Sequence, residues 1–121
     1  MHHVLLVDDS KTILMSLRAV LVKAGFGVAT AGDGVEALEV LKAGPKPSLI
    51  VTDLNMPRLN GIGFIKEARK TNRFVPILML TTESQQSSRD EGKAAGATGW
   101  LVKPVAPEAL ISVIKQLVPG A

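Results

Sequence analysis

The chain has 121 residues, of which 46% are hydrophobic and 21% are charged, and its formal net charge at pH 7 is +3. This length is typical of one domain with a buried core, and scattered basic residues with only 3% aromatic residues argue against nucleic-acid binding. The absence of cysteine excludes disulfides and thiolate metal sites. No signal peptide and no apolar run of ~20 residues is present, which favours a cytoplasmic protein that does not bind membranes.

The first predicted elements are a strand and a helix. Residues 4–7 are an apolar run that ends at Asp8 and Asp9. The helix that follows is capped by Ser10 or Asp9, has apolar residues at helical spacing, and stops at Gly25.

The next segment predicts strand, helix, loop and strand in turn. Residues 26–31 form a short second strand, and Asp33 with Glu36 has the spacing of a capping box at the start of a second helix. Residues 44–47 contain glycine and two prolines and predict a loop. Residues 49–53 read as a strand buried on both faces that ends on a carboxylate.

The last third repeats the alternation. Gly61 begins a third helix, and residues 77–81 form a fourth strand. Residues 83–95 are almost wholly polar and predict a weak, loosely held helix. Residues 100–102 form a fifth strand, and Pro107 begins the last helix.

Five strands alternating with five helices predict an α/β fold in which a doubly wound parallel sheet is covered on both faces. No internal repeat is present. We expect residues 1–121 to be a single domain with no output domain after it.

Polar residues follow four of the five strands. They are Asp8 and Asp9 after the first strand, Asp53 at the end of the third, Thr81 at the end of the fourth and Lys103 after the fifth. Because the carboxyl ends of parallel strands meet at one edge of a sheet, we expect these side chains to share a site.

Three carboxylates at such a site repel one another by about 4 kcal/mol per pair at ~4 Å and an effective dielectric of 20. Lys103 supplies one balancing charge, and a divalent cation would supply two more. Carboxylates and waters suit Mg²⁺, while the absence of cysteine and of a histidine cluster argues against Zn²⁺.

Together these motifs resemble the receiver domain of response regulators, of which CheY is the type. The resemblance covers the whole chain in order: Asp8-Asp9, the run from Asp53 to Pro57, Thr81, and Lys103-Pro104. It implies a flavodoxin-like, CheY-like fold with five helices and strand order 2-1-3-4-5.

The resemblance also implies roles for these residues. Asp53 would accept a phosphoryl group from a histidine kinase. Asp9, Asp53 and the backbone carbonyl of Asn55 would hold Mg²⁺, with Asp8 assisting through water. Thr81 and Lys103 would bind phosphoryl oxygens, and the Lys103–Pro104 peptide bond would be cis.

Three positions near this site refine the resemblance. Trp100 occupies the position of the family's switch aromatic, usually Tyr or Phe, and the alternative is a Trp that simply packs on an edge strand. Asn55 and Glu83 match residues of the chemotaxis regulators and would govern access of the hydrolytic water; alternatively, they are ordinary exposed loop residues.

The resulting expectation is a monomeric, stand-alone receiver that promotes its own phosphorylation and dephosphorylation but is not an enzyme. Helix 83–95, strand 100–102 and the last helix would form the output face, with the flagellar motor switch protein or another protein as target.

Alternative functions are a phosphorelay carrier or a phosphate sink outside chemotaxis. A haloacid-dehalogenase-type phosphatase is disfavoured because Asn55 stands where that chemistry needs a second Asp, and a nucleotide-binding module because the glycine-rich motifs are missing.

Overall fold

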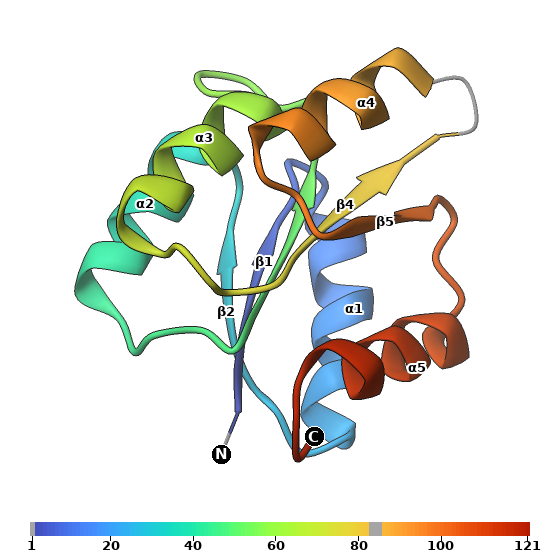
Figure 1. The fold of residues 1–121 in the computed structure, drawn as a ribbon. Coiled ribbons are helices and arrows are strands. Elements are labelled where there is room, and N and C mark those ends of the chain that lie inside the picture. The colour runs from blue at the N-terminus through green and yellow to red at the C-terminus, as the bar shows by residue number, and fades with distance from the viewer. Residues whose placement is uncertain (1, 83–85) are drawn as a thin grey trace.

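The computed structural model describes residues 2–82 and 86–121, and shows five strands alternating with five helices (Figure 1). In chain order the elements are β1 His3–Val7, α1 Lys11–Lys23, β2 Gly27–Ala31, α2 Gly34–Ala43, β3 Leu49–Asp53, α3 Gly61–Thr71, β4 Ile77–Thr81, α4 Gln86–Ala95, β5 Gly99–Val102 and α5 Pro107–Leu117.

The five strands form one parallel sheet in the order β2-β1-β3-β4-β5. This confirms the predicted doubly wound α/β fold and its strand order. All five residues of β3 and all five of β4 are buried, because helices cover both faces of the sheet at these central strands.

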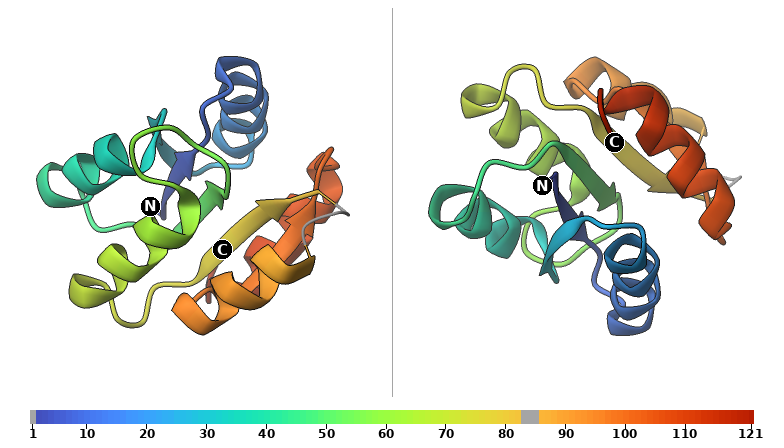
Figure 2. Two further views of the ribbon diagram at one scale, coloured as in Figure 1. Left: turned by 90° about the horizontal axis from the view of Figure 1, so that it is seen from above. Right: turned by 90° about the horizontal axis from the view of Figure 1, so that it is seen from below.

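Two apolar cores lie on opposite faces of the sheet. Alternate residues of β1, β3 and β4 pack against α1 and α5 on one face, and the residues between them pack against α2 and α3 on the other. The views along the sheet in Figure 2 show α1 and α5 on one side, with α2, α3 and α4 on the other. Burial on both faces explains why the strands are continuous apolar runs without polar alternation.

Three side chains cap the helices that begin near the carboxyl edge of the sheet. Ser10 accepts a hydrogen bond from the Ile13 amide at 3.3 Å, and Asp33 accepts one from the Glu36 amide at 2.8 Å. The predicted capping box is only half formed, because Glu36 accepts from the Gly32 amide at 3.3 Å and not from Asp33. The third cap, Asn60 at the start of α3, was not predicted; its side chain accepts a hydrogen bond from the Gly63 amide at 2.9 Å.

The fold brings the carboxyl ends of all the strands to one edge, and the chain termini lie at the opposite end of the molecule (Figure 1). Within the described ranges, every helix is too short or too polar to span a bilayer.

Candidate functional site: an acidic cluster at the carboxyl edge of the sheet

The polar residues predicted to share a site do converge. Asp8 and Asp9 follow the last residue of β1, and Asp53 ends the neighbouring strand β3. One carboxylate oxygen from each of these three residues lies within 4.8 Å of the others. Asp8 and Asp53 are buried and Asp9 is exposed, so the cluster opens to solvent on one side.

Local contacts fix the carboxylate of Asp53. Its Oδ1 accepts a hydrogen bond from the Leu54 amide at 2.8 Å, and its backbone carbonyl accepts one from the Thr52 hydroxyl at 2.8 Å. The Gly61 amide donates to the Leu54 carbonyl at 2.9 Å, and any side chain at Gly61 would collide with the backbone of Asp53 and Leu54. Glycine at the start of α3 is therefore required for the chain to return this close to the site.

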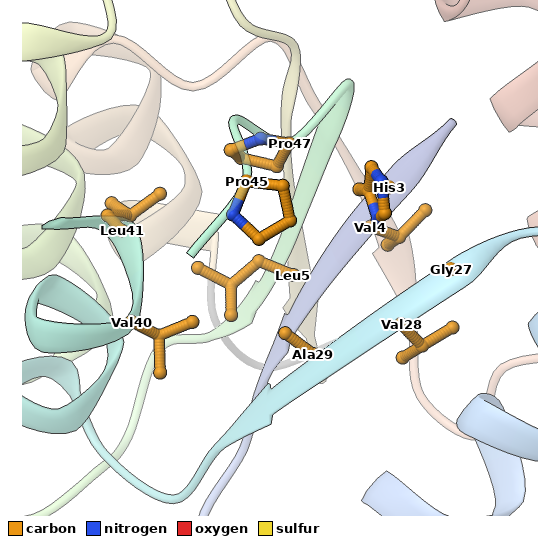
Figure 3. A pocket seen from close by; sticks show the side chains of 10 residues that line it. All are labelled: His3, Val4, Leu5, Gly27, Val28, Ala29, Val40, Leu41, Pro45 and Pro47. Carbon is orange, nitrogen blue, oxygen red and sulfur yellow. The ribbon is translucent and has the colours of Figure 1, made fainter. Parts of the chain in front are cut away.

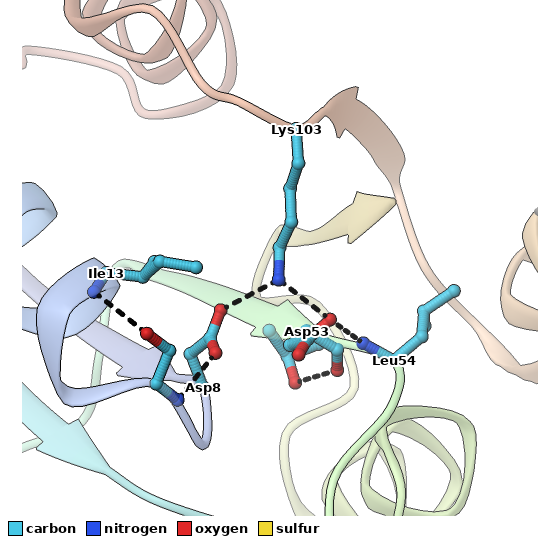
Figure 4. Close-up of polar contacts among 7 residues, drawn as sticks. Asp8, Ile13, Asp53, Leu54 and Lys103 are labelled. Atoms are coloured by element: carbon cyan, nitrogen blue, oxygen red, sulfur yellow. Dashed lines mark hydrogen bonds and ion pairs between the residues drawn. The ribbon is translucent and has the colours of Figure 1, made fainter. Parts of the chain in front are cut away.

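Lys103 reaches from the end of β5 to the two buried carboxylates (Figure 4). Its Nζ lies 3.1 Å from Oδ2 of Asp8 and 3.2 Å from Oδ1 of Asp53. The peptide bond from Lys103 to Pro104 is cis, as the resemblance predicts. One ammonium group therefore bridges two of the three carboxylates.

The charges at this cluster perturb one another. Burial raises the pKa of Asp8 above its ordinary value and the Asp53 carboxylate raises it further, while the Ser10 amide and Lys103 oppose the rise. Burial alone would lower the pKa of Lys103, but the carboxylates of Asp53 and Asp8 outweigh it, so this pKa lies above its ordinary value. Lys103 is therefore charged at neutral pH, yet it balances only one of the three nearby negative charges.

Thr81 lies at the end of β4, and its side chain is fully buried. Its hydroxyl oxygen has no hydrogen-bond partner among the residues that the structure describes. Leaving a buried hydroxyl unpaired costs roughly 1–3 kcal/mol, so its position beside a functional edge points to a partner that binds there.

The donor set fits a hard divalent cation. Three carboxylates supply oxygen ligands only, and one side of the cluster is open to water. Mg²⁺ prefers such oxygen ligands and keeps several of its waters. A charge of +2 would also balance the excess negative charge that Lys103 leaves.

The remaining predicted residues are Asn55, Glu83 and Trp100. Asn55 is exposed, two residues after Asp53. Glu83 lies outside the described residues. Trp100 is 36% exposed on β5, and its ring lies under Lys93 Nζ at 4.8 Å and Arg89 Cζ at 5.5 Å, both on α4.

Sequence reasoning missed contacts that only the folded chain reveals. The Ser10 amide donates to Oδ1 of Asp8 at 2.9 Å, so a backbone group orients this carboxylate. Arg58 forms a two-point ion pair with Asp33 across two loops. In the sequence, a lone arginine in a loop has the pattern of an ordinary surface residue. Only the structure shows that Arg58 is unusual, because its φ is positive, at 64°.

A pocket lies away from the acidic cluster, at the end of the sheet where β1 and β2 begin (Figure 3). Its lining is mainly apolar and includes Val40, Leu41, Pro45 and Pro47. Since none of its lining residues is acidic, it lacks the chemistry of the carboxyl edge.

Comparison with known proteins identifies the family. A family model described as the response regulator receiver domain matches residues 4–115. Among curated relatives, Response regulator MprA of Mycobacterium leprae (strain TN) is 42% identical over 114 residues, which are 94% of this chain and 50% of the relative. The chain thus spans about half the length of the curated relatives it matches.

Solved structures agree with this match. The chemotaxis response regulator CheY4 of Vibrio cholerae is 44% identical, with a TM-score of 0.90 over 98% of this chain and 99% of that chain. The receiver domain of the sensor histidine kinase PA1611 of Pseudomonas aeruginosa PAO1, solved with a magnesium ion in its active-site cleft, is 27% identical, with a TM-score of 0.87 over 96% of each chain. From the family match, these likenesses and the geometry of the carboxyl edge, we conclude that this chain belongs to the response regulator receiver domain family.

Proposed function

We propose that this chain receives a phosphoryl group on Asp53 from a histidine kinase, with Mg²⁺ held by Asp8, Asp9, Asp53 and the Asn55 backbone. The observation that carries the proposal is the position of Lys103, whose ammonium group lies between Asp8 and Asp53 at 3.1 and 3.2 Å. A cation held there is placed to bind an anionic group added to Asp53.

Each residue has a defined part in this reaction. The described contacts of the Asp53 side chain both use Oδ1, so we assign the attack on phosphorus to Oδ2. The new O–P bond forms as the N–P bond of the phosphohistidine breaks, and the bonding pair stays on the imidazole nitrogen. Bound Mg²⁺ would neutralise charge on the transferred oxygens.

Lys103 and Thr81 then stabilise the product. The ammonium group of Lys103 binds one phosphoryl oxygen, and the Thr81 hydroxyl donates a hydrogen bond to another. Thr81 thereby gains the partner that it lacks among the described residues. The chain acts as a signalling receiver, and water returns it to the starting state by hydrolysing the acyl phosphate, with Asn55 and Glu83 limiting access of that water.

The direct test is labelling with acetyl phosphate, which needs no kinase. In the presence of Mg²⁺ we expect the chain to take up close to one phosphoryl group per molecule, measured by intact-protein mass spectrometry. With a chelator in excess we expect no uptake, because the cluster then keeps its uncompensated negative charge. Equal uptake in both conditions would contradict the proposed metal requirement.

Activation should change the surroundings of Trp100, which is the only tryptophan. Its ring contacts Lys93 and Arg89 of α4, so any shift of that helix alters the emission. We expect beryllofluoride with Mg²⁺, a mimic of the phosphoryl group, to change the fluorescence intensity. An unchanged spectrum at saturation would contradict a switch based on Trp100, and Trp100→Phe should keep labelling while losing the signal.

For the output we propose a role in chemotaxis, with the flagellar motor switch protein binding the face formed by α4, β5 and α5. Similarity to CheY4 over 99% of that chain supports this role. Binding of the purified switch protein should tighten when beryllofluoride and Mg²⁺ are added. Affinity that does not depend on activation would count against the chemotaxis role.

The second candidate is the receiver portion of a larger regulator, or a phosphorelay carrier. The curated MprA relatives favour the first form, because this chain matches only about half of their length. Transfer of the phosphoryl group from Asp53 to a second histidine-containing protein would favour the carrier.

A further inference from the structure

The loop that carries the chain from Asp53 to α3 is tied to the start of α2. Arg58 donates from Nε to Oδ2 of Asp33 at 2.8 Å and from Nη2 to Oδ1 at 3.1 Å. The Gly34 amide donates to the Leu59 carbonyl at 3.1 Å, and a side chain at Gly34 would collide with Leu59. The two loops therefore meet through one backbone bond and one two-point ion pair.

Arg58 sits in a turn that disfavours its own side chain. Its φ is 64°, and the Leu59 amide donates back to the Pro57 carbonyl at 2.8 Å. A turn of this kind with positive φ is rare and strained for any residue except glycine. The conformation persists only if the surroundings hold it, and the ion pair to Asp33 is the side-chain contact that does so, beside the backbone bond from Gly34 to Leu59.

Asp33 is a firm anchor for this contact. Its side chain is largely buried, and its Oδ1 also accepts the Glu36 amide that begins α2. The guanidinium of Arg58, followed by the Glu36 amide, lowers the pKa of Asp33 below its ordinary value, so the carboxylate stays charged at neutral pH. A planar guanidinium matches a carboxylate at two points, which fixes direction as well as distance.

We propose that Arg58 is a positioning residue for the metal site: by holding the turn at residues 57–59, it fixes the path of the loop that carries Asn55. The inference rests on the proposed function, in which the Asn55 backbone helps to hold Mg²⁺. The other end of the loop is fixed by the bond from the Gly61 amide to the Leu54 carbonyl. A residue other than glycine that lacks the ion pair is therefore expected to relax out of the strained turn and to shift the segment between these two points.

Simple electrostatics and the proposed positioning role predict opposite changes in Mg²⁺ affinity for a variant that lacks the charge of Arg58. Removal of a positive charge from the protein would strengthen Mg²⁺ binding if charge alone mattered. Removal of a positioning contact weakens it. The sign of the change therefore separates the two explanations.

The test compares Mg²⁺ dissociation constants, measured by calorimetry on the unphosphorylated protein. Arg58→Met keeps the apolar stem but loses the ion pair, and we expect the constant to rise about tenfold. Arg58→Gly should stay within about twofold of wild type, because glycine adopts the turn without strain. Asp33→Asn keeps the helix cap but weakens the pair, and added to Arg58→Met it should cause no further loss.

Amide hydrogen exchange gives a readout that does not depend on metal. The Leu59 and Gly34 amides should exchange faster in Arg58→Met than in wild type, and at nearly the wild-type rate in Arg58→Gly. If wild type binds Mg²⁺ but Arg58→Met binds it equally or more tightly, or if Arg58→Gly is weakened as much as Arg58→Met, this inference is overturned. If wild type binds no Mg²⁺, the proposed function fails with it.

Discussion

Replacement of Asp53 by asparagine is expected to reduce labelling by acetyl phosphate to background. Asparagine has nearly the same shape and still offers an oxygen to the Leu54 amide, but its neutral amide is not a nucleophile toward phosphorus. Intact-protein mass spectrometry at saturating Mg²⁺ measures the result. The change isolates the chemistry of one oxygen from the fold that presents it.

Unfolding is not expected to explain the loss. At an effective dielectric of 20, Asp53 feels repulsion of roughly 3 kcal/mol from each of its two neighbouring carboxylates, against attraction of roughly 5 kcal/mol to Lys103. Without metal the variant should therefore be as stable as wild type or about 1 kcal/mol more stable, as checked by urea denaturation. The matched control is Asp90→Asn, which makes the same change on exposed α4 and should label normally.

Replacement of Arg69 by methionine is expected to lower the free energy of unfolding by about 2–3 kcal/mol. Its guanidinium donates to the carbonyls of Gly96, Asn72 and Val75, and so joins the ends of α3 and α4 to the start of β4. Burial lowers the pKa of Arg69, in keeping with a cation that is partly withdrawn from water. Each carbonyl left without a partner costs roughly 1–3 kcal/mol, and partial exposure reduces the total because water replaces some of these bonds.

For a domain of this size the loss corresponds to a fall in Tm of roughly 10 °C, measured by thermal denaturation. Methionine keeps the helix propensity and the apolar stem, so the change reports mainly on the hydrogen bonds. The control is Lys70→Met on the same helix, which removes only an exposed ion pair to Glu67 and should cost less than about 1 kcal/mol. Equal effects of the two substitutions would show that the carbonyl contacts of Arg69 contribute little.

Much of the architecture was predictable because it follows from local patterns. The run from Leu49 to Asp53 is apolar without polar interruption, and only a strand covered on both faces accounts for it. Asp33 caps its helix as its spacing predicts, and of the two predicted caps for the first helix, Ser10 and Asp9, it is Ser10 that caps it. Since parallel strands share one carboxyl edge, the meeting of Asp8, Asp53 and Lys103 followed from topology.

The contacts that were not predictable join residues far apart in sequence or depend on backbone geometry. Arg58 and Asp33 are 25 residues apart, and nothing in the pattern around either residue pairs them. The three carbonyls that Arg69 binds belong to the backbone, so no side-chain motif announces them. The half-formed capping box arises because Glu36 extends one residue further, to the Gly32 amide.

Asp53 alone among the carboxylates of the acidic cluster is the proposed phosphoryl acceptor, and peptide mapping can identify the labelled residue. Trypsin places Asp53 on the fragment of residues 43–58 and the other two acids on the fragment of residues 1–11. After labelling with acetyl phosphate and Mg²⁺, we expect the added phosphoryl group on fragment 43–58 alone, and we expect hydroxylamine to remove it as it removes acyl phosphates. A phosphoryl group on fragment 1–11, or one on fragment 43–58 that resists hydroxylamine and so lies on Ser48 or Thr52, would contradict the account.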